Sequence, residues 1–138
     1  MPDTRSKSPQ EITFAGFDAV IPFQVEPLDI RGRSVQLGPL LDNMLGRHQY
    51  PVSVNKLLAE AITLTVLLGT TLKFDGKFIL QTKSDGPVPM IVADFKTPDS
   101  IRAYAQFDAE AIAKLEAAGS ASVDRLLGKG ILAMTIDQ

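Results

Sequence analysis

The stretch VSVNKLLAEAITLTVLLGTTLKF, residues 52–74, decides the fold. Between Lys56 and Lys73, sixteen residues carry a single charge, that of Glu60, and apolar or small side chains would lie on every face of a helix. Such a helix has to be covered all round. It spans about 24 Å, and it is shorter than the roughly 20 apolar residues that a bilayer crossing needs. We therefore expect a buried central helix at about residues 53–73 and no membrane span.

Two Asp-Gly pairs follow this helix, and they are predicted to have different roles. Asp75-Gly76 comes directly after the helical stretch, so Gly76 is predicted to be the left-handed residue that ends the helix. Asp85-Gly86 lies between KFILQTK (residues 77–83) and PVPMIVADF (residues 87–95), which are rich in strand-forming side chains. The second pair is therefore predicted to be a chain-reversing turn between two antiparallel strands.

The other segments show strand and helix patterns in turn. Pro39 is suited to begin a short amphipathic helix that Gly46 ends. Residues 101–107 alternate apolar and polar side chains, as a half-buried strand does, and Asp108 is placed to cap the next helix. The further elements expected are strands at residues 20–25, 29–37 and 131–137, a helix at 109–119 and a helical turn at 122–127. The sequence thus predicts an α+β domain in which antiparallel sheets cover the central helix.

Composition argues against several classes of function. The chain has 138 residues, with 14 Lys and Arg against 16 Asp and Glu, and it lacks the clustered basic residues that are typical of nucleic-acid binding. It has no cysteine, so it can form neither a disulfide nor a zinc-thiolate site. Residues 1–18 are expected to form a disordered leader rather than a signal peptide, which indicates a cytoplasmic protein.

Few side chains suggest catalysis. His48 is the single histidine, so a two-histidine metal site cannot form. Gly128-Lys129-Gly130 differs from a phosphate-binding loop because Val123 stands where that motif requires glycine. Glu60 is a candidate general base if the apolar helix buries it; the alternative is a helix face on which Glu60 meets a cation or water. No catalytic residue and no metal-binding residue is therefore predicted.

Four segments together resemble the N-terminal core domain of the heat-shock protein 33 family, the redox-regulated bacterial holdases also called 33 kDa chaperonins. They are IRGRSV (residues 30–35), RHQYPVSVNKLLAEAITLTVLLGT (47–70), TLKFDGKFILQTKSDGPVPMIV (71–92) and LLGKGILAMTID (126–137). The match extends over residues 20–138 in the same order, and LKFDG followed by DGP is a specific pairing.

The resemblance implies both a function and an organisation. Members of the family are cytoplasmic, ATP-independent holdases that bind unfolding proteins during oxidative stress combined with heat, so no enzyme activity is expected. It implies a chaperone core domain at residues 19–138, truncated at its C-terminal end, and a homodimer whose protomers can exchange segments. It also places zinc, with the four cysteines that bind it, in a missing C-terminal region, so no cofactor is expected in this cysteine-free chain.

Binding of unfolded client proteins requires exposed apolar surface. The candidate client-binding residues are Ile21, Phe23, Leu28, Phe78, Leu80, Met90, Val92 and Phe95. The alternative for each is packing against the central helix or against a dimer partner. Two other functions stay open. One is an acyl-thioester enzyme with a fold like the hot-dog fold and with Glu60 as the base. The other is a module that only assembles a larger protein.

Overall fold

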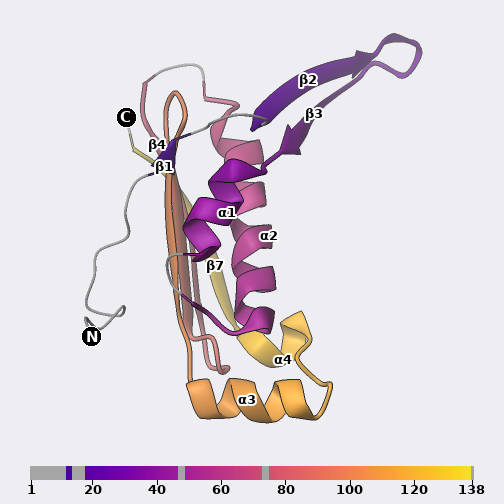
Figure 1. Cartoon of the computed structure of the whole chain (residues 1–138). Helices are drawn as coiled ribbons and strands as arrows, with labels where there is room; N and C mark the ends of the chain where they lie inside the picture. Colours follow the sequence, from indigo (N-terminus) through magenta and orange to yellow (C-terminus); the bar gives the residue numbers. More distant parts are fainter. Residues whose placement is uncertain (1–11, 14–17, 47–48, 73–74, 138) are drawn as a thin grey trace.

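The computed structural model describes residues 12–13, 18–46, 49–72 and 75–137, and it shows an α+β domain with a projecting arm (Figure 1). The helices are α1 (Pro39–Gly46), α2 (Val52–Gly69), α3 (Ala109–Ala117) and α4 (Val123–Leu127). The strands are β1 (Ile12–Thr13), β2 (Ala19–Val25), β3 (Ile30–Gln36), β4 (Lys77–Ser84), β5 (Met90–Lys96), β6 (Ser100–Gln106) and β7 (Gly130–Asp137). A short 3-10 helix, η2 (Glu26–Leu28), joins β2 to β3.

Five strands form one antiparallel sheet in the order β1-β6-β5-β4-β7, and β2 and β3 form a separate antiparallel ribbon. The hairpin predicted at Asp85-Gly86 is confirmed, because β4 and β5 pair on either side of it. The N–H of Ser84 closes this hairpin by donating to the carbonyl oxygen of Pro89 at 3.0 Å. The predicted α+β class, with antiparallel sheets and a central helix, is therefore confirmed.

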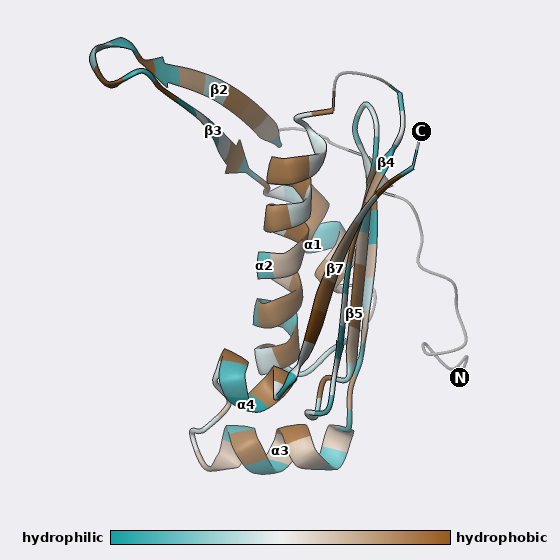
Figure 2. Cartoon of the chain, turned by 180° about the vertical axis from the view of Figure 1, so that it is seen from behind, coloured by the Kyte–Doolittle hydropathy of each residue, from teal (hydrophilic) through white to brown (hydrophobic). Residues whose placement is uncertain are grey.

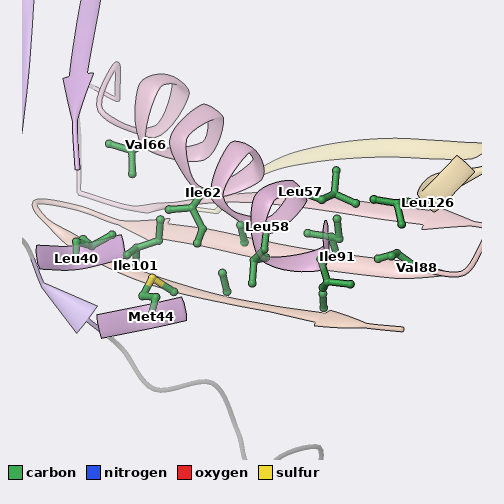
Figure 3. Close-up of a cluster of buried hydrophobic side chains, with 14 of the residues drawn as sticks. Leu40, Met44, Leu57, Leu58, Ile62, Val66, Val88, Ile91, Ile101 and Leu126 are labelled. Atoms are coloured by element: carbon green, nitrogen blue, oxygen red, sulfur yellow. The ribbon is translucent and has the colours of Figure 1, made fainter. Parts of the chain in front are cut away.

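One face of the five-stranded sheet carries the apolar core. Residues that lie opposite each other in an antiparallel pair point to the same face, and the register places Phe78 beside Phe95 and Leu80 beside Ala93. Helix α2 packs across this face, over β4, β5 and β6 (Figure 3). The apolar side chains that α2 buries there are Val54, Leu57, Leu58, Ile62 and Val66. Packing of one helix face on one sheet face therefore forms the centre of the core, which also includes buried residues of α1, α3 and α4.

The end of α2 differs from the prediction. The helix ends at Gly69 rather than near residue 73, and positive φ among the described glycines occurs at Gly119 and Gly128. The prediction that Gly76 ends the helix in a left-handed conformation is therefore wrong. Gly69 lies so close to β5 that a Cβ atom there would be 2.6 Å from Cδ2 of Phe95. This close approach to Phe95 is a tertiary contact that local sequence does not reveal.

Helix α2 is also not covered all round. Val52, Lys56, Glu60 and Leu64 follow one another at four-residue spacing, and all four are exposed. We call these residues the outer stripe of α2. By length and mean hydropathy, 1.5 over 18 residues, α2 passes the composition test for a membrane-crossing helix. In this fold its opposite face packs on the sheet, so α2 is a core helix with one uncovered side.

Two parts of the expected leader have defined structure. β1 pairs with β6, with Ile12 opposite Ile101. The carboxylate of Asp18 accepts hydrogen bonds from the backbone N–H groups of Gly38, at 2.8 Å, and Leu40, and so caps the start of α1. Residues 1–11 and 14–17 lie outside the described residues, as does His48.

Candidate functional site

The ribbon of β2 and β3, with η2 at its tip, forms an arm that extends away from the rest of the domain (Figures 1 and 2). One face of this arm is apolar, because the register places Ile21, Phe23 and Val25 on the same side as Ile30. The ring of Phe23 lies over Gly32, its cross-strand partner, where any Cβ atom would meet the ring. All four apolar side chains of this face are exposed.

The opposite face of the arm is turned toward the domain. Val20 and Val35, which are directly paired, pack against the hydrophobic core and fix the base of the arm. Arg31 and Arg33 follow on the same face. The arm is therefore held by one face, while its apolar face stays uncovered in the single chain.

Three of the predicted client-binding residues lie on the arm. Ile21 and Phe23 belong to its apolar face, and Leu28 lies in η2 at its tip with 67% of its surface exposed. The structure thus brings these three together on one exposed surface. Sequence reasoning missed Val25 and Ile30 on the same surface, although the alternation of β2 could have indicated Val25.

Three other candidates are buried in the core. Phe78, Leu80 and Phe95 are 6%, 2% and 0% exposed, and they point toward α2. Met90 and Val92 lie on the outer face of the sheet and are partly buried. The eight candidates therefore occupy three separate places: the arm, the core and the outer sheet face. The exposed arm residues are the ones that another polypeptide can reach directly.

A second exposed apolar surface lies on β7, and the predicted residues do not include it. Leu132, Met134 and Ile136 continue the core face of the sheet beyond α2, in register with Thr82, Leu80 and Phe78, and each is more than half exposed (Figure 2). The signal in the sequence is the segment GILAMTI, which has no charged residue. A strand segment without charge is unusual at the edge of a sheet, because edge strands normally carry charge or proline.

Glu60 does not have the environment that the enzyme hypothesis requires. Its side chain is exposed on the outer stripe of α2, in an open groove that also contains Lys56 and Arg125. The premise that the apolar helix buries this carboxylate is therefore wrong. Across the described ranges, no group of three or more His, Cys, Asp or Glu side chains could hold a metal ion.

The start of α2 is fixed from outside the helix. Its N-cap residue is Pro51, whose side chain cannot accept a hydrogen bond from the helix. The carboxylate of Glu116 on α3 instead accepts the hydrogen bond from the backbone N–H of Ser53 and so caps α2. Hydrogen bonds from the backbone and side chain of Ser53 lower the pKa of Glu116. Just before α2, the Tyr50 oxygen accepts a hydrogen bond from the N–H of Ala105, and burial raises the pKa of this phenol. The contact between Glu116 and Ser53 lies in the groove that also contains Glu60.

Fold and surface together define a small α+β domain that exposes apolar side chains and lacks an evident catalytic centre among its described residues. The chain matches the family model described as Hsp33 protein over residues 18–138, and it belongs to that family. The match confirms the resemblance seen in the sequence.

Individual relatives share this similarity. The chain is 44% identical over 122 residues to the 33 kDa chaperonin of Caulobacter vibrioides, covering 88% of this chain and 40% of the relative. It is 39% identical over 115 residues to the 33 kDa chaperonin of Pseudomonas fluorescens, covering 83% and 37%. The chain thus spans about 40% of the length of the curated relatives that it matches.

Proposed function

We propose that this chain is the core domain of an ATP-independent holdase chaperone, which binds unfolding proteins under oxidative and heat stress. Membership of the Hsp33 family and similarity to proteins named 33 kDa chaperonin support this function. The protein acts in the cytoplasm as a homodimer whose protomers can exchange segments, as the family resemblance implies. It holds its clients by contact alone and carries out no chemical reaction on them.

The exposed apolar face of the arm is the observation that supports this function best. Soluble monomers rarely expose a contiguous apolar patch larger than a few hundred Å². Here five large apolar side chains gather on one ribbon: Ile21, Phe23, Val25, Leu28 and Ile30. Burial of apolar area is non-directional, so such a surface accepts many sequences, as a holdase requires. The arm is therefore the client-binding surface in this proposal, with Ile21, Phe23 and Leu28 as its first contacts.

The other predicted residues have lesser roles in the proposal. Met90 and Val92 offer a smaller, partly buried contact on the outer sheet face. Phe78, Leu80 and Phe95 reach a client only if α2 moves off the sheet, because all three are buried beneath it. Client contact at these three positions would therefore compete with folding of the domain itself.

In this proposal, redox control of the chaperone does not reside in the 138 residues of this chain. The chain has no cysteine, so it does not fit a zinc-thiolate switch. The family resemblance implies that zinc belongs to a C-terminal region that this chain does not include. Oxidation of cysteine therefore cannot turn the holding activity of this chain on or off.

The direct test is light scattering of a heat-unfolded client protein, without ATP, at increasing ratios of chain to client. We expect suppression of aggregation by the unmodified chain, and at least about a twofold loss of suppression in Phe23→Ser because its ring supplies much of the exposed area. Gln24→Ser, on the opposite face of β2, is the matched control and should keep full activity. Unchanged scattering at several-fold excess of the folded chain would exclude the holdase function for this domain.

A further inference from the structure

The turn between β4 and β5 is joined to the end of α4 by backbone hydrogen bonds. The N–H of Gly86 donates to the carbonyl oxygen of Leu127 at 3.0 Å. The N–H of Val88 donates to the carbonyl oxygen of Leu126 at 2.9 Å. The two backbones lie so close together that a Cβ atom at Gly86 would be 2.6 Å from the carbonyl oxygen of Leu126. The turn and the end of α4 therefore hold each other by their main chains.

Asp85 joins the same two segments through both its backbone and its side chain. Its N–H donates to the carbonyl oxygen of Lys129 at 2.9 Å, and its Oδ1 atom accepts from the N–H of Lys129 at 2.7 Å. A hydrogen bond to a carboxylate is about twice as strong as one between neutral groups. We call the two hydrogen bonds of Asp85, together with those of Gly86 and Val88, the clasp.

Helix α4 has little else to keep it in place. It has five residues, far fewer than a helix needs to be stable by itself. Leu126 is its one buried residue, and Val123 at its start is 46% exposed. Gly119 and Gly128, on either side of α4, both have positive φ. A short segment with one apolar anchor and glycine at both ends is typical of a unit that opens locally.

Leu126 closes one end of the hydrophobic core. It belongs to the buried cluster that also contains Leu57 and Val88, and Figure 3 shows these three at the same end of that cluster. Val88 is 0% exposed and Leu57 is 6% exposed. Leu57 and Leu126 also line the groove beside α2. Movement of α4 away from this place would therefore uncover three large apolar side chains.

We propose that residues 120–128 form a lid over this end of the core, that the clasp holds the lid shut, and that the lid opens while the sheet stays folded. Opening uncovers Leu57 and Val88 and frees Leu126, far from the arm (Figure 1). These side chains form a second, concealed site for the apolar segments of an unfolding client, because apolar contact is non-directional. Client binding here rests on the proposed function, whereas the opening does not.

Hydrogen exchange of single amides measures the opening in the intact chain. The amides of Gly86 and Val88 report the lid, and the amide of Ala93, on the central strand β5, reports the sheet. Urea below the unfolding midpoint should accelerate exchange at Ala93, because global unfolding exposes much surface. Exchange at Gly86 and Val88 should change little with urea, because a small opening exposes little surface.

Two matched variants separate the lid from the whole domain. Asp85→Ala removes the carboxylate that holds Lys129, and Asp18→Ala removes one that accepts from the N–H of Gly38 at 2.8 Å, at the start of α1. Asp85→Ala should accelerate exchange of the lid amides about tenfold, after correction for intrinsic rates. Asp18→Ala should leave the lid amides unchanged, because the cap of α1 stays formed when the lid opens. Both variants should accelerate the sheet amide, since both weaken the whole fold.

The apolar site has its own measurement. Fluorescence of the dye ANS, which binds exposed apolar surface, should rise about twofold in Asp85→Ala and stay unchanged in Asp18→Ala. With a heat-unfolded client, Asp85→Ala should suppress aggregation at about half the ratio of chain to client that the unmodified chain needs.

Three outcomes would overturn the inference. Equal acceleration of the lid amides by the two variants, or equal urea dependence of lid and sheet amides, would show that the lid opens only when the whole domain unfolds. Faster exchange in Asp85→Ala without more dye fluorescence would exclude the apolar site. Exchange and dye binding need no client, so the lid and the holdase function can each fail while the other stands.

Discussion

The carboxylate of Glu116 on α3 caps the N-terminus of α2 by accepting two hydrogen bonds from Ser53. Its Oε2 atom lies 2.8 Å from the backbone nitrogen of Ser53 and 2.7 Å from its Oγ atom. The two residues are 63 positions apart in the sequence. A carboxylate at this end of a helix satisfies a free N–H group and faces the positive end of the helix dipole. The contact therefore joins α3 to the central helix.

Replacement of this cap should weaken the domain. In Glu116→Gln the amide keeps an acceptor oxygen but loses the charge, so the melting temperature should fall by a few degrees. Glu110→Gln, on the same helix in an exposed position, is the control. It loses only the interaction of a first-turn carboxylate with the dipole of α3, so its melting temperature should fall less than that of Glu116→Gln. Equal melting temperatures of Glu116→Gln and the unmodified protein would show that the cap contributes nothing to stability.

The same contact should make stability depend on pH. The pKa of Glu116 in the folded protein lies below its ordinary value of 4.5 because the hydrogen bonds from Ser53 favour the carboxylate. The unfolded chain therefore binds this proton more readily, and the contribution is present above the unfolded pKa and lost as pH falls through the folded one.

Thermal unfolding between about pH 6 and pH 3 measures this loss. The difference in melting temperature between the unmodified chain and Glu116→Gln should shrink as the pH falls. A constant difference across that range would contradict the assignment to Glu116.

Gly69 offers a prediction in which two effects have opposite signs. Alanine in a helix is favoured over glycine by about 1 kcal/mol. A Cβ atom at Gly69, however, would meet the ring of Phe95, and overpacking of this kind costs about 1–3 kcal/mol. Phe95 is fully buried and has little room to move, so we expect Gly69→Ala to lower the free energy of unfolding.

Gly46→Ala is the control for this substitution, because nothing lies within 4 Å of a Cβ atom there. Urea unfolding should show a lower midpoint for Gly69→Ala and an unchanged or higher one for Gly46→Ala. A gain in stability for Gly69→Ala would mean that the ring of Phe95 shifts at little cost.

Local patterns were sufficient for the elements whose signals lie within a few residues. The hairpin at Asp85-Gly86 and the Asp108 cap of α3 followed from turn and capping chemistry alone. The end of α2 at Gly69 did not, because the apolar pattern continues to Leu72 although the backbone changes to three-residue hydrogen bonds at Thr71 and Leu72. The composition of α2 also could not show its uncovered stripe, since apolar residues lie on all of its faces.

For the candidate site, too, local patterns predicted the strands but not which of their residues are exposed. Ile21 and Phe78 both lie on strands with alternating apolar residues, yet Ile21 is exposed and Phe78 is buried. The pattern of a strand identifies its apolar face, but only the position of α2 decides which face is covered. The apolar edge of β7 was missed for the same reason, because its exposure depends on how far α2 extends across the sheet.

The ion pair between Asp94 and Arg102 makes a last prediction, on the outer face of the sheet. The residues are cross-strand partners on β5 and β6, with Nη2 of Arg102 2.8 Å from Oδ2 of Asp94 and Nε 3.2 Å from Oδ1. The Asp94 side chain is only 11% exposed, so removal of the guanidinium leaves a nearly buried carboxylate without this partner. We expect Arg102→Gln to cost about 1–3 kcal/mol in the free energy of unfolding. Asp94→Asn combined with Arg102→Gln should recover part of that loss, because the buried charge is gone. If the double variant were no more stable than Arg102→Gln, packing of the arginine side chain rather than the unpaired charge would explain the loss.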